Sequence, residues 1–283
     1  MMRIRATGSD FLKKDFLAVL IIVVNAFSWY FPLYVFFLNT LEKNQVGFSI
    51  LLDALGIHFM GVTGFAFIGT ILVKKFPSRS AFLCLWMFTG AISSALLFTL
   101  DVNNIVSLLS VSFLLGTSLG LGFPSCLAYF GDYSIEENRG RVGGITFFVS
   151  ALGMLLVGFL VNMSTFVVGV LILTLWRSLG LILFLLIKPK QEHGQGMVEV
   201  SYRLAITDKS LVLYLVPWIM FCLVNFFEFP IVTNFFGSDF TLLILIAEYG
   251  IGGFSALIGG HFADSVGRSP IIIMDIRFGA IRK

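Results

Sequence analysis

Residues 16–38, FLAVLIIVVNAFSWYFPLYVFFL, form an apolar run that contains no charged side chain. A helix needs about 20 mainly apolar residues to cross the hydrocarbon of a bilayer, so this run predicts a transmembrane helix. It follows Lys13 and Lys14, but it is too long for the apolar region of a signal peptide and no small-x-small cleavage site follows it. We therefore expect it to be retained as the first span.

The composition of the whole chain agrees with a membrane location. Of its 283 residues, 58% are hydrophobic, 15% aromatic and only 12% charged. A soluble domain is closer to half apolar and a quarter charged, which excludes a soluble enzyme, a disordered tail and a secreted disulfide scaffold. The net charge of +3 is small and dispersed, so no nucleic-acid partner is expected.

The three cysteines, Cys84, Cys126 and Cys222, lie inside apolar stretches and share no metal-type or redox-type spacing. They are typical of small core residues. We expect no metal and no cofactor.

Eight apolar segments are long enough to span a bilayer when the chain is divided at charged and turn-forming clusters. They cover approximately residues 16–38, 48–73, 80–100, 105–130, 142–163, 165–187, 211–233 and 240–263. The least distinct boundary is the tight turn at 162–164, where the uninterrupted apolar stretch is twice too long for one helix. The predicted fold is all-α, a polytopic transmembrane helical bundle.

The distribution of Lys and Arg orients these spans, because cytoplasmic loops collect basic residues. Only Lys43 falls in a loop on the other side of the predicted topology. The basic residues on the first side are Arg3, Arg5, Lys13, Lys14, Lys74, Lys75, Arg79, Arg139, Arg141, Lys188, Lys190, Arg203, Lys209 and Arg268. This pattern predicts a cytoplasmic N-terminus in a multi-pass protein of the plasma membrane.

The longest hydrophilic stretch, residues 188–210, divides the chain into two parts. We expect a six-helix N-terminal half over 16–187, a cytoplasmic linker over 188–210, and two further helices over 211–263. An ordinary cytoplasmic loop is the alternative interpretation of 188–210. The other loops are too short to fold a catalytic domain outside the bilayer.

After the eighth span the sequence reads GHFADSVGRS over residues 260–269. Its Gly260, Asp264, Gly267 and Arg268 resemble the loop Gly-x-x-x-Asp-(Arg/Lys)-x-Gly-(Arg/Lys), which the major facilitator superfamily carries after its second and its eighth helix. The motif falls after the eighth span of an independent hydropathy count. Without that agreement, Asp264 and Arg268 would be interpreted as an i,i+4 ion pair at a helix end.

The first copy of this loop, after the second span, is degenerate. Gly69 and Lys74 match the family pattern, whereas Val73 occupies the acidic position. A third stretch, between the fourth and fifth spans, is similar to the family's acidic and Arg-Gly-Arg loop and contains Arg139 and Arg141. The resemblance implies that these residues form a cytoplasmic gate.

The resemblance also implies twelve helices in two six-helix halves, with a solute site between the halves. This chain supplies one complete half and two helices of the second, and residues 264–283 look like the signature loop and a ninth helix that stops. We expect a truncated carrier that does not transport alone and that needs separately encoded C-terminal helices or an oligomer.

Polar residues on the helices that line the cavity in the resembled family are the candidate solute contacts. Asn25 and Trp29 share a face of the first of these spans, and Asn225 and Glu228 share a face of the seventh. The alternatives are helix–helix hydrogen bonds for the two Asn and an interfacial position for Trp29 and Glu228.

Ionisable groups inside a bilayer are functional candidates by default, since each costs about 2.5–3.5 kcal/mol at the helix centre. Asp53 lies shallowly below the outer face, His58 near the midplane and Glu248 roughly 12 Å deep at about 1.5 Å per residue. These three are candidates for carrying a coupled proton. Asp53 and Glu248 are near enough to the surface to stay hydrated instead.

Arg177 lies near the middle of the sixth span, beside Trp176. It could bind an anionic solute, pair with an acid on a neighbouring helix, or extend to the interface if the span is misplaced by a turn. We favour the pairing. Glycines within the second, fifth and eighth spans are best explained by close helix packing.

The resemblance implies a permease that moves a small solute by alternating access, with a coupled proton or sodium ion or along the solute gradient. One competing hypothesis is a non-transporting membrane scaffold or sensor derived from such a carrier. Another is an intramembrane enzyme, but His58, His193 and His261 are scattered and no metalloprotease or nucleophile-elbow spacing occurs. We therefore predict that the chain is not an enzyme and that its partners are the lipid bilayer and the solute.

Overall fold

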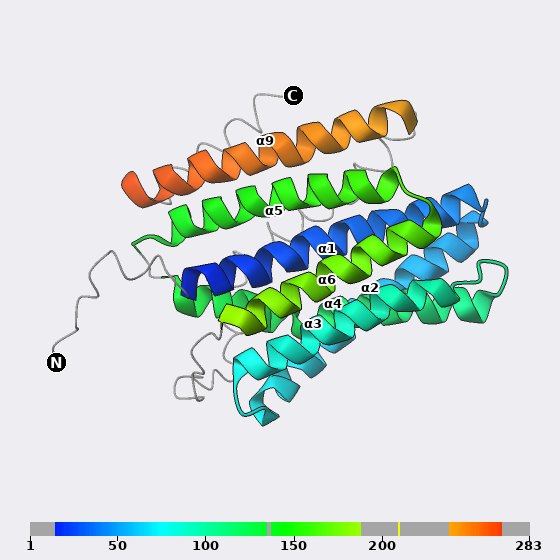
Figure 1. Cartoon of the computed structure of the whole chain (residues 1–283), viewed down its shortest axis with the longest axis horizontal. Coiled ribbons are helices and arrows are strands. Elements are labelled where there is room, and N and C mark those ends of the chain that lie inside the picture. Colours follow the sequence, from blue (N-terminus) through cyan, green and yellow to red (C-terminus); the bar gives the residue numbers. More distant parts are fainter. Residues whose placement is uncertain (1–14, 135–136, 188–208, 210–237, 268–283) are drawn as a thin grey trace. The chain divides into compact units, whose positions relative to one another are not determined.

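The computed structural model describes residues 15–134, 137–187, 209 and 238–267, and all regular structure in this part of the chain is helical. Seven α-helices are present in these residues (Figure 1). They are α1 Asp15–Lys43, α2 Phe48–Leu72, α3 Arg79–Ala95, α4 Ile105–Tyr133, α5 Arg139–Asn162, α6 Phe166–Ile187 and α9 Ser238–Ser265. Short 3₁₀ turns, Val73–Lys75 and Leu96–Thr99, continue α2 and α3.

The all-α prediction is confirmed, and the helices follow the predicted spans closely. The first six are long and apolar enough to cross a membrane. The prediction of a tight turn after residue 162 is confirmed, because α5 ends at Asn162 and α6 begins at Phe166. The eighth predicted span corresponds to α9, while the seventh, 211–233, lies outside the described residues.

Local side chains explain where several helices begin. The Ser78 hydroxyl accepts the backbone N–H of Ala81 at the start of α3, and the Asn104 side chain accepts two N–H groups at the start of α4. Between α1 and α2, Gln45 has φ 55° and turns the chain. Helix α1 continues five residues past the predicted span, because its polar end, NTLEK, remains helical beyond the apolar run.

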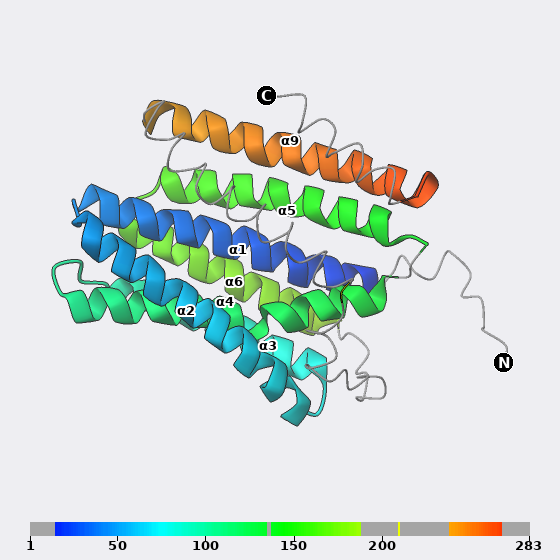
Figure 2. The ribbon, with the colours of Figure 1, turned by 180° about the vertical axis from the view of Figure 1, so that it is seen from behind.

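The chain divides into two compact units, one of residues 1–193 with 249–283 and one of residues 194–248. In the first unit α1 packs against α4, α5 and α6, as Figures 1 and 2 show for α5. Helix α2 packs against α4, and α3 packs against α4 and α6. The described residues of the second unit are Lys209 and the first part of α9, residues 238–248.

The interior of the first unit contains large side chains that are completely enclosed, among them Trp29, Trp86 and Arg177. The outer surface is apolar as well: Phe48 is 74% exposed and Leu186 is 71% exposed. In water such a surface would be unstable, but lipid tails solvate it, and so helix association depends on close packing rather than on hydrophobic burial.

Glycines bring α2 and α4 into direct backbone contact. A Cβ on Gly69 would overlap the carbonyl oxygen of Leu121, and one on Gly116 would overlap that of His58. By contrast, Gly56 and Gly64 of α2 have nothing within 4 Å. The expected packing role therefore applies to Gly69 and not to every glycine of this helix.

Candidate functional site

Arg177 lies at the centre of the six-helix bundle, between the rings of two tryptophans. Its guanidinium carbon is 4.4 Å from the ring centre of Trp29 on α1 and 4.3 Å from that of Trp86 on α3. The side chain is 0% exposed. A desolvated cation over an aromatic face gains about 2 kcal/mol, so this double stacking offsets part of the cost of burying the charge.

Asn25 connects Arg177 to α1 through both ends of its amide. Arg177 Nη1 donates to Asn25 Oδ1 at 2.8 Å, and Asn25 Nδ2 donates to the carbonyl oxygen of Trp176 at 2.8 Å. Trp29 Nε1 donates to the Ser94 hydroxyl of α3 at 2.7 Å. The polar groups of the predicted solute contacts Asn25 and Trp29 are thus bonded inside the bundle, to α6 and α3.

Two further nitrogens of Arg177, Nε and Nη2, are buried and have no hydrogen-bond partner among the described residues. Among the described residues an ion pair joins Arg79 to Asp132, and no ion pair involves Arg177. The expected pairing of Arg177 with an acid on a neighbouring helix stays a prediction, because residues 210–237 lie outside the described chain. Its complete burial argues against the alternative that it extends to the interface. The faces of Trp29 and Trp86 stabilise the buried charge of Arg177, a role that was expected for a carboxylate.

His58 is enclosed between α1, α2 and α4 and is 1% exposed. Its Nε2 is 2.8 Å from the hydroxyl of Tyr30, and its Nδ1 is 3.1 Å from the carbonyl oxygen of Ser112. The Ser112 hydroxyl donates to the carbonyl oxygen of Ala54 at 2.7 Å, which joins α4 to α2 beside the imidazole. Both ring nitrogens therefore have defined partners.

The other proton-carrying candidates lie on open surfaces of the described chain. Asp53 is exposed on α2, and Glu248 is exposed on α9. The candidate solute contacts Asn225 and Glu228 lie outside the described residues. His58 is thus the enclosed member of the predicted set.

Asp264, near the end of α9, binds the N-terminus of α5. One carboxylate oxygen accepts the N–H of Gly140 at 2.9 Å, and the other accepts the N–H of Arg141 at 2.7 Å. A Cβ on Gly140 would lie 2.6 Å from both Asp264 Oδ1 and the carbonyl oxygen of Gly260. Two separate matches to the family pattern, the eighth-span loop and the Arg-Gly-Arg loop, therefore meet in space.

The rest of the predicted gate is placed as follows. Gly267 has φ 103°, which favours glycine, and Arg268 lies outside the described residues. At the end of α2, Lys74 is exposed and Val73, which replaces the acid of the first copy, is buried. Gly69 is the α2 residue that packs on Leu121.

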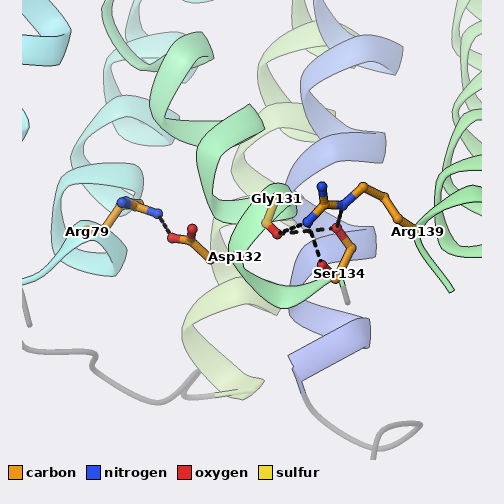
Figure 3. Close-up of polar contacts among 5 residues, drawn as sticks. All are labelled: Arg79, Gly131, Asp132, Ser134 and Arg139. Carbon is orange, nitrogen blue, oxygen red and sulfur yellow. Dashed lines mark hydrogen bonds and ion pairs between the residues drawn. The ribbon is translucent and has the colours of Figure 1, made fainter. Parts of the chain in front are cut away.

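Arg139, the first residue of α5, caps the C-terminus of α4 with its guanidinium group (Figure 3). Its Nε donates to the Ser134 hydroxyl at 3.0 Å, and its Nη2 donates to the carbonyl oxygens of Ser134 at 2.9 Å and Gly131 at 3.3 Å. Cations at a helix C-terminus satisfy carbonyls that lack a helical partner. In the same view Arg79 of α3 pairs with Asp132 of α4.

Sequence reasoning missed Tyr30, Ser112 and Trp86. Tyr30 sits directly after Trp29, and a tyrosine in mid-span is a signal that could have been used, since its hydroxyl requires a partner when it is buried. Trp86 is likewise far from the interface where tryptophans gather in membrane proteins. Ser112 acts through its backbone carbonyl, for which the sequence carries no signal.

An aromatic cluster, defined by Phe27, Phe31, Phe123 and Phe147, joins α1, α4 and α5. Phe27 stacks on Phe31 with ring centres 5.9 Å apart and meets Phe123 and Phe147 edge to face, each at 5.6 Å. The exposed fraction of Phe147 is 45%, so the cluster reaches the surface of the six-helix bundle. With 32 phenylalanines in the chain, the sequence could not single out these four.

Comparison with known proteins gives one match. The family model described as Major Facilitator Superfamily matches residues 4–158, which is more than half of the chain. No curated protein and no solved structure matches it. The matched region begins before α1 and ends within α5, so it includes the Arg177 partners on α1 and α3, His58, and the α5 side of the Asp264 contact.

Proposed function

We propose that this chain, which belongs to the major facilitator superfamily, takes part in moving a small solute across a membrane by alternating access of two helical bundles. Members of that family are transporters rather than enzymes, and the chain is a multi-pass membrane protein. Our proposal adds the mechanism, secondary-active transport driven by a coupled ion or the solute gradient. It also adds the plasma membrane as the location, with the N-terminus in the cytoplasm.

The contact between Asp264 and α5 is the observation that carries this proposal. The first N–H groups of a helix lack helical partners and carry partial positive charge, so a carboxylate there is stabilising by about 0.3–2 kcal/mol. Helix α5 precedes the 188–210 segment and α9 follows it. A bond of this strength between them supports a latch that closes in one state and opens in another.

The surfaces that meet along α5 and α9 contain several small residues and the ring pair of Phe148 and Phe254. A Cβ on Gly144 would lie 2.5 Å from the carbonyl oxygen of Ala256, and one on Gly253 would lie 2.9 Å from the Ala151 Cβ. The small-residue contacts can separate with little repacking, and the Phe148–Phe254 pair, whose ring centres are 5.1 Å apart, must part with them. This is what rocking of one bundle against another requires.

Residues that contact a solute must have side chains that are not already bonded within the bundle. Asn25, Trp29 and Arg177 are engaged with each other and with α3, so we propose that on this half they position α1 rather than meet solute. The aromatic cluster of Phe27, Phe31, Phe123 and Phe147 carries no charge and reaches the surface. We propose that this cluster contacts an apolar or aromatic portion of the solute. Asn225 and Glu228 are the proposed polar contacts of the other half.

Cysteine alkylation in membrane vesicles tests alternating access. In a C84A/C126A/C222A background, A151C places one thiol at the α5–α9 contact, where Ala151 is 5% exposed. An open state populated at about 1–10% makes this thiol react with a water-soluble maleimide at least about tenfold faster than a permanently enclosed one. The matched control is A26C, since Ala26 is 1% exposed inside the bundle core of α1.

Adding D264A should raise the alkylation rate of A151C from the cytoplasmic side by about tenfold, because up to ~2 kcal/mol of latch energy is lost. S265A is the control for that variant, since the Ser265 hydroxyl donates to the carbonyl oxygen of Phe262 in its own helix. Equal slow rates for A151C and A26C, unchanged by D264A, would contradict alternating access and favour the scaffold or sensor hypothesis.

A further inference from the structure

We propose that His58 and Tyr30 form a proton-binding site in the centre of the six-helix bundle, and that the ion coupled to transport is a proton. This inference rests on the proposed function and names the coupling ion for it. The observation behind it is the pair of hydrogen bonds that hold the imidazole between α1 and α4.

The depth of His58 fits a coupling site. It lies ten residues from the start of α2 at Phe48, which at about 1.5 Å per residue is roughly 15 Å. The hydrocarbon core of a bilayer is about 30 Å thick, so the imidazole sits near the midplane. A site there can be reached from one face in one state and from the opposite face in another.

The partners of the imidazole define its neutral form. A backbone carbonyl only accepts hydrogen bonds, so Nδ1 of His58 carries the hydrogen and donates to the Ser112 oxygen. In the neutral ring Nε2 is then an acceptor, and the hydroxyl of Tyr30 donates to it. Every polar atom of the neutral pair is satisfied.

The same two partners bind both nitrogens of the protonated ring. When Nε2 binds a proton from water it becomes a donor, and the Tyr30 oxygen, after rotation of its O–H bond, accepts from it. The Nδ1–H bond to Ser112 is unchanged. Uptake and release therefore move one proton between water and Nε2. The Tyr30 O–H···Nε2 bond is replaced by an Nε2–H···O bond, and the hydroxyl hydrogen of Tyr30 turns to the water that brings the proton.

The groups around His58 make proton binding depend on whether water reaches the imidazole. The titratable side chains that contact His58 in the described structure are Tyr30 and Tyr34, both on α1, with the Tyr34 ring centre 5.5 Å away. On α4 the imidazole meets the Ser112 carbonyl, and the acid of its own helix, Asp53, is exposed one and a half turns away. Since no carboxylate contacts the ring in the described part of the chain, an enclosed imidazolium costs free energy, and the proton binds when water reaches the site.

Tyr34 marks the route by which water arrives. It lies one turn from Tyr30 toward the Lys43 end of α1, stacks on Tyr30 with ring centres 6.2 Å apart, and is partly exposed. Opening of the α1–α2 contact at Tyr34 admits water to His58, and closing it favours proton release. This linkage between proton occupancy and opening is what a coupled carrier needs.

Nitrogen-15 NMR of histidine-labelled protein in phosphatidylcholine nanodiscs tests the site without any transported solute. The chain has three histidines, so H193Q/H261Q leaves His58 as the sole imidazole. Between about pH 4 and pH 9, where histidine charge ordinarily changes, the ring should convert from the protonated to the neutral signal. In Y30F the ratio of protonated to neutral signal at a given pH should fall about tenfold, because the hydrogen bond lost from the charged ring is stronger than the one lost from the neutral ring.

A His58 signal that stays neutral over this range, or one that Y30F leaves unchanged, would overturn the proposal. The alkylation rate of A151C separates this failure from failure of the proposed function. If A151C is accessible and its rate responds to pH in the parent chain but not in H58Q, both proposals are supported. If A151C is accessible while its rate is independent of pH, the chain alternates but His58 is not its proton site.

Discussion

Single residues in this bundle are held by partners that lie far away in the sequence. Arg177 and Asn25 are 152 positions apart, and Trp29 and Ser94 are 65 apart. The sequence indicated that Arg177 is inside a span, because length and hydropathy decide that, but a charge within a span can be compensated by an acid, an amide or an aromatic face. The choice depends on which helices are neighbours, and no local pattern encodes it.

Arg177→Lys and Arg177→Met should have different effects on stability. Lysine keeps the charge but has no planar group to fill the space between Trp29 and Trp86. We expect the free energy of unfolding to fall by about 2–4 kcal/mol, because two desolvated cation–π contacts are weakened. Methionine removes the charge and its desolvation cost, so it should be less destabilising than lysine. Thermal unfolding in detergent measures both, and an R177K protein as stable as the parent would contradict the account.

Gly90→Ala should destabilise the same cluster from the α3 side. A Cβ there would lie 2.6 Å from Arg177 Nε and 3.3 Å from the Trp29 ring, so the guanidinium must shift, at a cost of about 1–3 kcal/mol. Gly56→Ala is the matched control, because a Cβ at Gly56 meets nothing within 4 Å and alanine favours the helix. Equal melting temperatures for the two variants would argue against the tight packing around Arg177.

At the scale of helices the sequence was a reliable guide. Apolar length predicted α1 to α6 and α9 with ends displaced by a few residues, because in a bilayer every backbone group must be bonded within the helix. It could not decide which face of a helix meets another helix, since lipid-facing and buried faces are equally apolar. Gly64 and Gly69 illustrate this: both are glycines of α2, and the first lies in open space while the second lies against α4.

Gly69→Ala should therefore weaken the α2–α4 contact, whereas Gly64→Ala should not. The added Cβ at Gly69 would overlap the backbone of Leu121, which cannot rotate away as a side chain could, and we expect a loss of at least about 1–3 kcal/mol. The pair differs only in position along one helix, so melting temperatures in detergent compare them directly. A Gly69→Ala protein at least as stable as Gly64→Ala would show that α2 does not pack on α4 as described.

At the scale of the whole molecule the sequence predicted the family, and the family model confirms that prediction. What it did not predict is that Asp264 and the Gly140–Arg141 backbone meet, although all three lie in stretches that resemble family motifs. Their separation of more than 120 positions hides the contact from any local pattern. The contacts of a solute likewise come from helices that are distant in sequence, so no local pattern in the chain encodes its identity.

The distance between the start of α5 and the end of α9 tests the central claim, that a carboxylate latch between these helices opens and closes. Pulsed electron paramagnetic resonance in lipid measures this distance between spin labels on E137C and V266C. Both positions are exposed, and neither belongs to the latch. A latch of this kind should give a short-distance population in the parent chain that D264A converts largely into a longer one, while S265A leaves it unchanged. A single distance distribution shared by the parent and D264A would contradict it.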